Sequence, residues 1–217
     1  MTFPRRHPLL APYLDAQLAG DRRAALELVV ERGLAGGETV PTMQLEVVQP
    51  AQREIGRLWQ ENRITVAQEH VATAISQLVL SHLYPRLPRP PAIGRIALVA
   101  CVEGEHHDVG ARMGADFFEM AGFDVRYLGA DVPTRSLLEM IDAVRPDVLG
   151  LSVAMSFNVP SLERTVAAVR LSHGPKLPIV VGGNVVAWLP ALRERLAVQG
   201  LGMSADELVA DCRELLA

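Results

Sequence analysis

The stretch EGEHHDVG, residues 103 to 110, combines two histidines with three acidic side chains directly after a short apolar run. A histidine that ligates a metal usually binds through one ring nitrogen and donates the N–H of the other to a carboxylate. Glu105 lies two residues before His107, and in an extended segment residues i and i+2 point to the same side. Glu105 can therefore orient His107 as an axial ligand of a metal, and Gly110 lets the following helix approach the bound group.

The number of ligands limits which metal this histidine can serve. A zinc site takes three or four protein ligands, whereas His7, His82 and His173 fall in unrelated segments. One histidine with few other ligands suits a metal that a macrocycle already holds. No G-x-G-x-x-G or G-K-S/T motif follows the apolar run, so neither a dinucleotide fingerprint nor a phosphate loop is present. A charged loop that serves only solubility is the plain alternative.

Strand-like and helix-like segments alternate in the second half of the chain. The strand-like runs are 95–101, 124–129, 147–153 and 178–183, and the helix-like segments are 111–122, 134–144 and 161–171. This alternation predicts a parallel sheet with helices on both faces. Ligands bind outside the carboxyl ends of such strands. The histidine stretch, Ser152 and the pair Gly182–Gly183 follow or end strands, so we expect them at one edge of the sheet.

The first half of the chain reads as a bundle of four helices, because apolar residues recur at intervals of three and four. We expect these helices at residues 10–19, 21–34, 40–60 and 65–85. Pro50 predicts a kink or break in the third helix. Thr65 with Gln68 forms a capping-box pattern at the start of the fourth. The stretch PRLPRPPAIGR, residues 85–95, is typical of a semi-rigid linker between domains at 10–87 and 93–217.

The motif Glu105-x-His107-x-x-Gly110, followed by Ser152 and then by Gly182-Gly183, resembles the cobalamin-binding domain of the methionine synthase and mutase type. The resemblance covers roughly residues 93 to 217 and implies a flavodoxin-like fold. Glu105 stands where that family usually has aspartate, and Ala154 stands where it usually has leucine. These departures concern the slot for the cofactor's nucleotide tail more than the ligand of cobalt.

The same resemblance implies a set of cofactor contacts. His107 replaces the cofactor's own benzimidazole as the lower axial ligand of cobalt. The nucleotide tail then lies in a slot beside Ser152 and the two glycines. Asp108 and Ser156, which lie next to these motifs in the sequence, are included among the expected cofactor-binding residues.

The helical half contains a second candidate group, in the stretch WQENRITVAQEH from residue 59 to residue 70. Trp59 ends one predicted helix and Glu69 lies in the first turns of the next, so the two can face the same space. Ala72, Thr73 and Ser76 share the face of Glu69 and are small, which predicts room for a ligand. The alternative is that Trp59 is a core residue and that Glu69 and His70 only form a favourable charged first turn.

A tryptophan, nine residues, and then Glu-His resembles the signature of the light-sensing cobalamin proteins of the CarH/LitR type. In that family a four-helix bundle covers the upper face of adenosylcobalamin. The resemblance implies that Trp59, Glu69 and His70 cap this face. Those photoreceptors usually begin with a MerR-type DNA-binding domain, for which this chain has no room, so we expect no direct DNA binding. Gln60 stands where well-known members carry a histidine that captures cobalt after illumination.

These patterns lead to one expected function and two alternatives. We expect a non-enzymatic photosensor that binds adenosylcobalamin and signals, for example in transcription regulation, through a partner protein or self-association. The alternatives are a corrinoid carrier that uses methylcobalamin as the non-catalytic subunit of a methyltransferase system, and a storage protein. The net charge of -4 and pI near 5.9 argue against general nucleic-acid binding. No apolar run reaches membrane-spanning length and no signal peptide is recognised, so the expected location is cytoplasmic.

Overall fold

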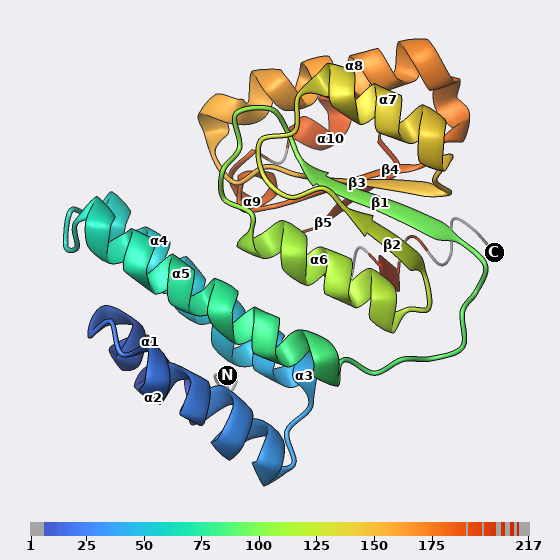
Figure 1. Ribbon diagram of the computed structural model, residues 1–217. Coiled ribbons are helices and arrows are strands. Elements are labelled where there is room, and N and C mark those ends of the chain that lie inside the picture. Colours follow the sequence, from blue (N-terminus) through green and yellow to red (C-terminus); the bar gives the residue numbers. More distant parts are fainter. Residues whose placement is uncertain are drawn as a thin grey trace, which may run out of the picture. The chain divides into compact units, whose positions relative to one another are not determined.

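The computed structural model describes residues 7–189, 191–196, 198–202, 205–206, 209–210 and 212. The chain divides into two compact units, Met1–Pro88 and Arg89–Ala217, named here the helical unit and the sheet unit (Figure 1). No helix among the described residues is both long and apolar enough to cross a membrane.

The helical unit contains the four predicted helices. Its α-helices are α1 (Leu10–Leu18), α2 (Arg22–Leu26), α3 (Val40–Thr42), α4 (Gln49–Gln60) and α5 (Val66–Leu83). A π-helical segment, Glu27–Gly33, and a 3-10 turn, Leu34–Gly36, continue α2, and a second π-helical segment, Met43–Val48, joins α3 to α4. A 3-10 turn, Tyr84–Arg86, follows α5. The prediction of four helical stretches is confirmed, although α-geometry covers only part of the second and third.

Local sequence signals explain where these helices begin. The Thr65 side chain accepts from Gln68 N at 3.2 Å and the Gln68 side chain accepts from Thr65 N at 2.9 Å, which confirms the capping box. Pro50 does not break the third helical stretch, which runs on through it. It lies in the first turn of α4, where the missing N–H is tolerated, and the helix changes there from π to α geometry.

The sheet unit is built on five parallel strands. They are β1 (Ile96–Cys101), β2 (Asp124–Tyr127), β3 (Val148–Ser152), β4 (Ile179–Gly182) and β5 (Gly200–Gly202). Their order across the sheet is β2-β1-β3-β4-β5, and every neighbouring pair is parallel. This is the flavodoxin-like order, which confirms the predicted fold class. The sequence did not predict β5, whose three residues include two glycines.

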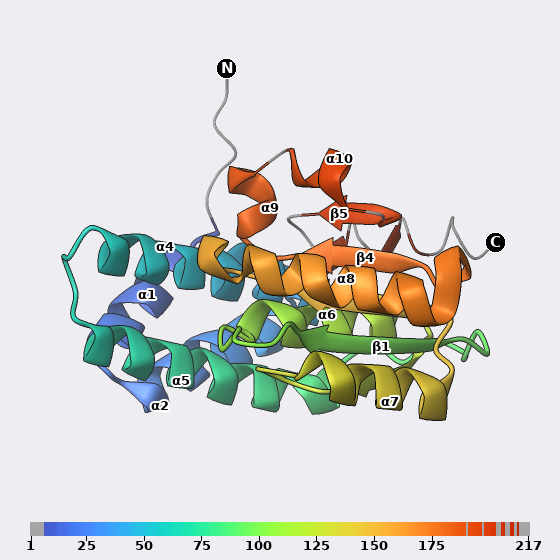
Figure 2. The ribbon, with the colours of Figure 1, turned by 90° about the horizontal axis from the view of Figure 1, so that it is seen from above.

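Helices cover both faces of this sheet. They are α6 (Val109–Met120), α7 (Thr134–Val144), α8 (Val159–His173) and the short α9 (Val185–Trp188) and α10 (Leu192–Arg195). In Figure 1, α7 and α8 lie on one face and α6 lies on the other, and Figure 2 shows the same layers from above. Residues of β1 and β3 such as Leu98 and Leu149 are fully buried, because both faces of the strands are covered.

The chain continues from β1 to β2 on one side of the sheet and from β3 to β4 on the other side. The strand order therefore reverses between the neighbouring strands β1 and β3. Cys101 at the end of β1 is in register with Ser152 at the end of β3, and Ser152 is in register with Gly182 at the end of β4. The loops that follow these strands therefore start side by side at the carboxyl edge. The prediction that the histidine stretch, Ser152 and the glycine pair share one edge is confirmed.

Candidate functional site

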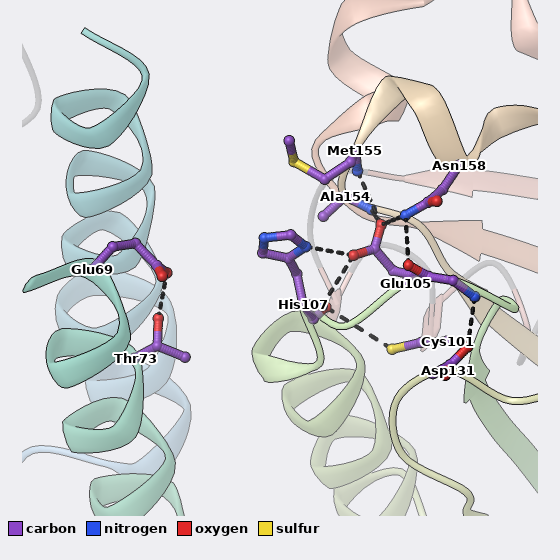
Figure 3. A network of polar contacts seen from close by, with 10 residues as sticks. Glu69, Thr73, Cys101, Glu105, His107, Asp131, Ala154, Met155 and Asn158 are labelled. Carbon is purple, nitrogen blue, oxygen red and sulfur yellow. Dashed lines mark hydrogen bonds and ion pairs between the residues drawn. The ribbon is translucent and has the colours of Figure 1, made fainter. Parts of the chain in front are cut away.

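The centre of the site is the pair Glu105 and His107, in the loop between β1 and α6 (Figure 3). His107 Nδ1 lies 2.5 Å from Glu105 Oε1, and the backbone N–H of His107 donates to the same oxygen at 3.0 Å. The Glu105 side chain is fully buried, whereas the His107 side chain is 48% exposed. With Nδ1–H donated to the carboxylate, metal ligation falls to Nε2 on the outer side of the ring.

The second oxygen of Glu105 joins this loop to the loop after β3. Oε2 accepts from the backbone N–H groups of Ala154 at 2.9 Å and Met155 at 3.0 Å, and from Asn158 Nδ2 at 3.0 Å. The carboxylate thus receives five hydrogen bonds from two loops at the point where the strand order reverses. Asn158 was missed in the sequence analysis, because only the folded topology brings it next to Glu105.

These donors determine the charge of Glu105. Burial alone raises the pKa of a carboxyl group, since it disfavours the ionised form. Here the hydrogen bonds from the His107 ring, the Asn158 side chain and the backbone of His107 and Met155 outweigh burial and lower the pKa of Glu105 to about 2. Glu105 is therefore a permanent acceptor at neutral pH, and it favours the His107 tautomer that carries its proton on Nδ1.

The loop that contains Glu105 is also hydrogen-bonded to the loop after β2. Asp131 Oδ1 accepts from Gly104 N at 2.7 Å, and Asp131 N donates to Glu105 O at 2.9 Å. On the other side, Asn158 Nδ2 donates to Gly104 O at 3.2 Å. Gly104 has a φ of 84°, which a residue with a side chain rarely adopts. Asp131 is a second supporting residue that sequence reasoning missed.

Asp108 and Gly110 lie where this loop enters α6. Tyr127 OH contacts Asp108 Oδ2 at 3.2 Å and the Asp108 carbonyl oxygen at 3.3 Å. Burial and the nearby charge of Asp108 raise the pKa of Tyr127, so the phenol stays a donor. A Cβ built on Gly110 would meet no protein atom within 4 Å, so packing within the protein does not require this glycine.

The other predicted contacts of the sheet unit come from the ends of β3 and β4. Ser152 is buried at the end of β3, and Ser156 is exposed at the start of the 3-10 turn Ser156–Asn158. Gly182 ends β4, and Gly183 follows with a φ of 111°. A Cβ on Gly183 would lie 2.0 Å from the backbone oxygen of Val153, so no side chain fits there. The glycine therefore permits the close approach of two loop backbones.

The helical unit carries the remaining predicted residues. Trp59 lines a hollow of about 280 Å³ at the turn between α4 and α5, together with Asn62, Arg63, Ile64, Thr65, Val66 and Gln68. Glu69 Oε1 accepts from Thr73 Oγ1 at 2.7 Å, and Glu69 Oε2 lies 2.6 Å from His70 Nδ1. Both oxygens of this carboxylate are thus held, while the His70 ring is largely exposed.

The expectation that Ala72, Thr73 and Ser76 leave room for a ligand was wrong. Ala72 and Ser76 are fully buried within the helical unit, and Thr73 is hydrogen-bonded to both Glu69 and Gln52. Small size indicated space, but Ala72 and Ser76 face the helical core and Thr73 is half-buried. The hydroxyl groups of Thr73 and Ser76 bind to neighbouring side chains.

The residues of this site fit a metal ion that a macrocycle already coordinates. Among the residues that the structure describes, no group of three or more His, Cys, Asp or Glu side chains could hold a metal ion. Cys101 is buried close to His107, and burial, with the charges of Asp108 and Glu105, raises the pKa of its thiol to about 12. The thiol is therefore protonated and does not compete as a ligand. One oriented, half-exposed histidine suits a macrocyclic metal cofactor.

Comparison with known proteins agrees with this geometry. A family model described as "B12 binding domain" matches residues 95–210, and a second model of the same description matches residues 9–84. The "HTH-type transcriptional repressor CarH" of Myxococcus xanthus is 35% identical over 155 residues, which cover 70% of this chain and 50% of the repressor. The chain thus spans about half the length of this relative.

Other relatives match over nearly their whole length. "Dimethylamine corrinoid protein 1" of Methanosarcina acetivorans is 26% identical over 211 residues, or 94% of this chain and 91% of that protein. The solved structure of the Methanosarcina barkeri monomethylamine corrinoid protein superposes with a TM-score of 0.84 at 18% identity, covering 95% of this chain and 98% of that one. At this identity the structural similarity shows a shared fold.

Proposed function

This chain belongs to the B12-binding family, whose models match both of its units, and on that premise we propose that it is a light sensor that holds adenosylcobalamin. The observation that carries the proposal is that one helical unit holds both Trp59, which lines an open hollow ending at Gln68, and the next residue, Glu69, whose carboxylate is held at both oxygens. A ring to stack on and an acceptor for hydroxyl groups suit a large upper ligand, whereas a methyl group needs neither.

Each predicted residue has a role in this proposal. His107, oriented by Glu105, would present Nε2 to cobalt from below. Ser152, Ser156, Gly182 and Gly183 would line the slot for the nucleotide tail, with Asp108 and Gly110 at its rim. Trp59, Glu69 and His70 would contact the upper ligand. The bound cofactor supplies a cobalt–carbon bond that light can break.

The signal would come from the contacts that the upper ligand makes. A switch requires contacts that differ between its two states, and Trp59 and Glu69 are the residues that would gain or lose them. The output would be a change in self-association or in binding to a partner protein that regulates transcription. Direct DNA binding is not part of the proposal. Gln60 has an amide where a cobalt-binding histidine would stand, so position 60 does not capture cobalt after illumination.

The sensor proposal is tested by light and size together. The protein is loaded with adenosylcobalamin in the dark, and its absorption spectrum and elution volume are measured before and after green light. We expect a histidine-ligated dark spectrum and a change in both properties on illumination. Methylcobalamin is also photolysed, so it is the control: its photolysis should alter the spectrum and leave the elution unchanged. A light-independent elution volume with adenosylcobalamin, and with any added partner, would contradict the sensor function.

A second function is favoured by a specific observation. The dimethylamine corrinoid protein aligns over 91% of its own length, so this chain matches nearly all of such a protein. In that role the chain would carry a methyl group on cobalt between partner enzymes, as a non-catalytic subunit. Equal binding of methyl- and adenosylcobalamin, together with no effect of light on size, would favour this role.

The contribution of Trp59 can be measured directly. Replacing Trp59 by alanine removes a large planar surface and is expected to weaken adenosylcobalamin binding about tenfold while changing methylcobalamin binding little. Paired titrations of the cofactor-free protein in the dark give both dissociation constants. Tyr84→Ala, which removes another aromatic ring of the helical unit, is the matched control. Equal loss of affinity for both cofactors would mean that Trp59 supports the fold and does not select the ligand.

A further inference from the structure

A continuous path of hydrogen bonds crosses the core of the helical unit and ends on Glu69. Gln17 of α1 donates from Nε2 to Ser76 Oγ of α5 at 2.9 Å. Ser76 Oγ donates to Gln52 Oε1 of α4 at 2.9 Å, and Gln52 Nε2 donates to Thr73 Oγ1 of α5 at 2.6 Å. Thr73 Oγ1 then donates to Glu69 Oε1 at 2.7 Å. Three helices are joined through side chains alone.

The directions of the first bonds follow from the number of hydrogens available. Gln17 Nε2 also donates to the Ala72 carbonyl at 3.0 Å, and since a carbonyl only accepts, the orientation of the Gln17 amide is fixed. Ser76 has one hydroxyl hydrogen, which Gln52 Oε1 takes. Tyr13 OH, 3.3 Å from Ser76 Oγ, must therefore be the donor in its own contact. The hydrogens of this part of the path all point away from α1.

The end of the path uses Glu69 as a hydrogen-bond acceptor. Thr73 has one hydroxyl hydrogen and gives it to Glu69, so it must accept from Gln52 Nε2. If the Gln52 amide were reversed, Thr73 would have to donate to Gln52 and no hydrogen would remain for Glu69. The carboxylate and the orientation of the amide therefore stabilise each other, and every bond of the path supports Glu69 as an acceptor.

Close packing of the helical core does not require such a path of hydrogen bonds. Gln17 and Ser76 are almost completely buried, and buried polar groups destabilise a fold unless they are all hydrogen-bonded. Apolar side chains of similar size would fill a helical core at least as well. Thr73 takes one lone pair of Oε1 and His70 faces Oε2, so each oxygen keeps lone-pair capacity for a further donor.

We propose that Thr73 and Gln52 are positioning residues that hold the Glu69 carboxyl group oriented as an acceptor, so that the helical unit prefers an upper cobalt ligand with hydroxyl groups to one without them. This inference rests on the proposed function, since it assigns the upper ligand to the helical unit. Thr73 and Gln52 themselves contact Glu69 or each other and act on the ligand only through that carboxylate.

The test compares the binding of adenosyl- and methylcobalamin in the dark. Thr73→Val keeps the side-chain shape but removes the hydroxyl group, and it is expected to weaken adenosylcobalamin binding about tenfold while methylcobalamin binding changes less than twofold. Thr73→Ser keeps the hydroxyl group and should retain the wild-type preference. Ser81→Ala, which removes a hydroxyl group from α5 outside the path, is the matched control.

A double-mutant cycle separates positioning from a general loss of structure. Glu69→Gln should lower the preference by itself, and adding Thr73→Val should then lower it no further, because Thr73 acts through Glu69. A purely structural role of Thr73 would weaken both cofactors and would add to the effect of Glu69→Gln. Circular dichroism and thermal melting of each cofactor-free variant report whether the helical unit is folded.

A second variant covers the case in which Thr73→Val unfolds the protein. Gln52→Met together with Thr73→Val removes both polar partners, and Ser76 can then turn its hydrogen to Tyr13. Replacing both partners of a hydrogen bond is often nearly neutral for stability, and the same loss of preference is expected. If the wild type prefers adenosylcobalamin and the folded variants keep that preference, the inference alone is wrong. Equal binding of both cofactors by the wild type would also overturn the inference, whereas the proposed function fails only if light leaves the elution volume unchanged.

Discussion

Replacing His107 by alanine is expected to abolish the histidine-ligated absorption spectrum of bound cobalamin. The cofactor would retain only its contacts with the loops and with the helical unit, and its affinity should fall at least about tenfold. Absorption spectroscopy of the reconstituted protein and a binding titration measure the two effects.

The size of this effect follows from the composition of the site. His107 is the one histidine whose ring is oriented by the buried Glu105 carboxylate, and no cluster of three metal-binding side chains exists among the described residues to replace it. His106→Ala is the matched control, because His106 is an exposed neighbour in the same loop. A His107→Ala variant with an unchanged spectrum would show that another group ligates cobalt.

Replacing Glu105 by glutamine is expected to lower the free energy of unfolding of the cofactor-free protein by about 3 kcal/mol at neutral pH. The amide has nearly the same shape as the carboxylate, but its nitrogen cannot accept any of the five hydrogen bonds that the carboxylate receives. Whichever way the amide turns, donors from His107 or from the β3 loop face another donor. Urea unfolding measures the change, and Glu105→Asp, which restores the family's usual residue, should lose less.

The same substitution should change how stability depends on pH. The pKa of Glu105 is lowered from 4.5 to about 2 in the folded protein, so the folded state favours the ionised form. Its contribution is complete above pH 4.5 and is lost as the pH falls towards 2. The wild type should therefore lose more stability than Glu105→Gln over this interval, by roughly 3 kcal/mol. Parallel loss in the two proteins would contradict the pKa of Glu105.

The features that the sequence predicted are those formed by residues close together along the chain. The pair Glu105 and His107 was predictable because two neighbouring residues of one loop form it. The strands were predictable where apolar runs were long enough, and β5 was not, since Gly200–Gly202 has one apolar side chain between two glycines. Asn158 and Asp131 carry no local signal. They reach Glu105 only because the parallel topology brings three loops to the same edge.

The helical unit shows the same limit in another way. Apolar periodicity predicted helix for Glu27–Gly33 and Met43–Val48, but it does not separate α from π geometry, which differ by one residue in the hydrogen-bond spacing. Thr73 and Ser76 were assigned to the face of Glu69, and their exposure was misjudged. Small polar residues are compatible with an open site and with a buried network, and only the neighbours Gln17 and Gln52 distinguish the two.

The buried carboxylate of Glu105 also has a kinetic consequence. Because its hydrogen bonds join the β1 and β3 loops through groups of the protein alone, these loops hold each other in place without a contribution from any ligand. If the chain holds cobalamin as proposed, the association rate would be governed by encounter and by release of the cofactor's own base, and the lifetime of the complex by the contacts made afterwards. A site organised by its own hydrogen bonds loses little conformational entropy when a ligand binds, so more of the contact energy appears as affinity.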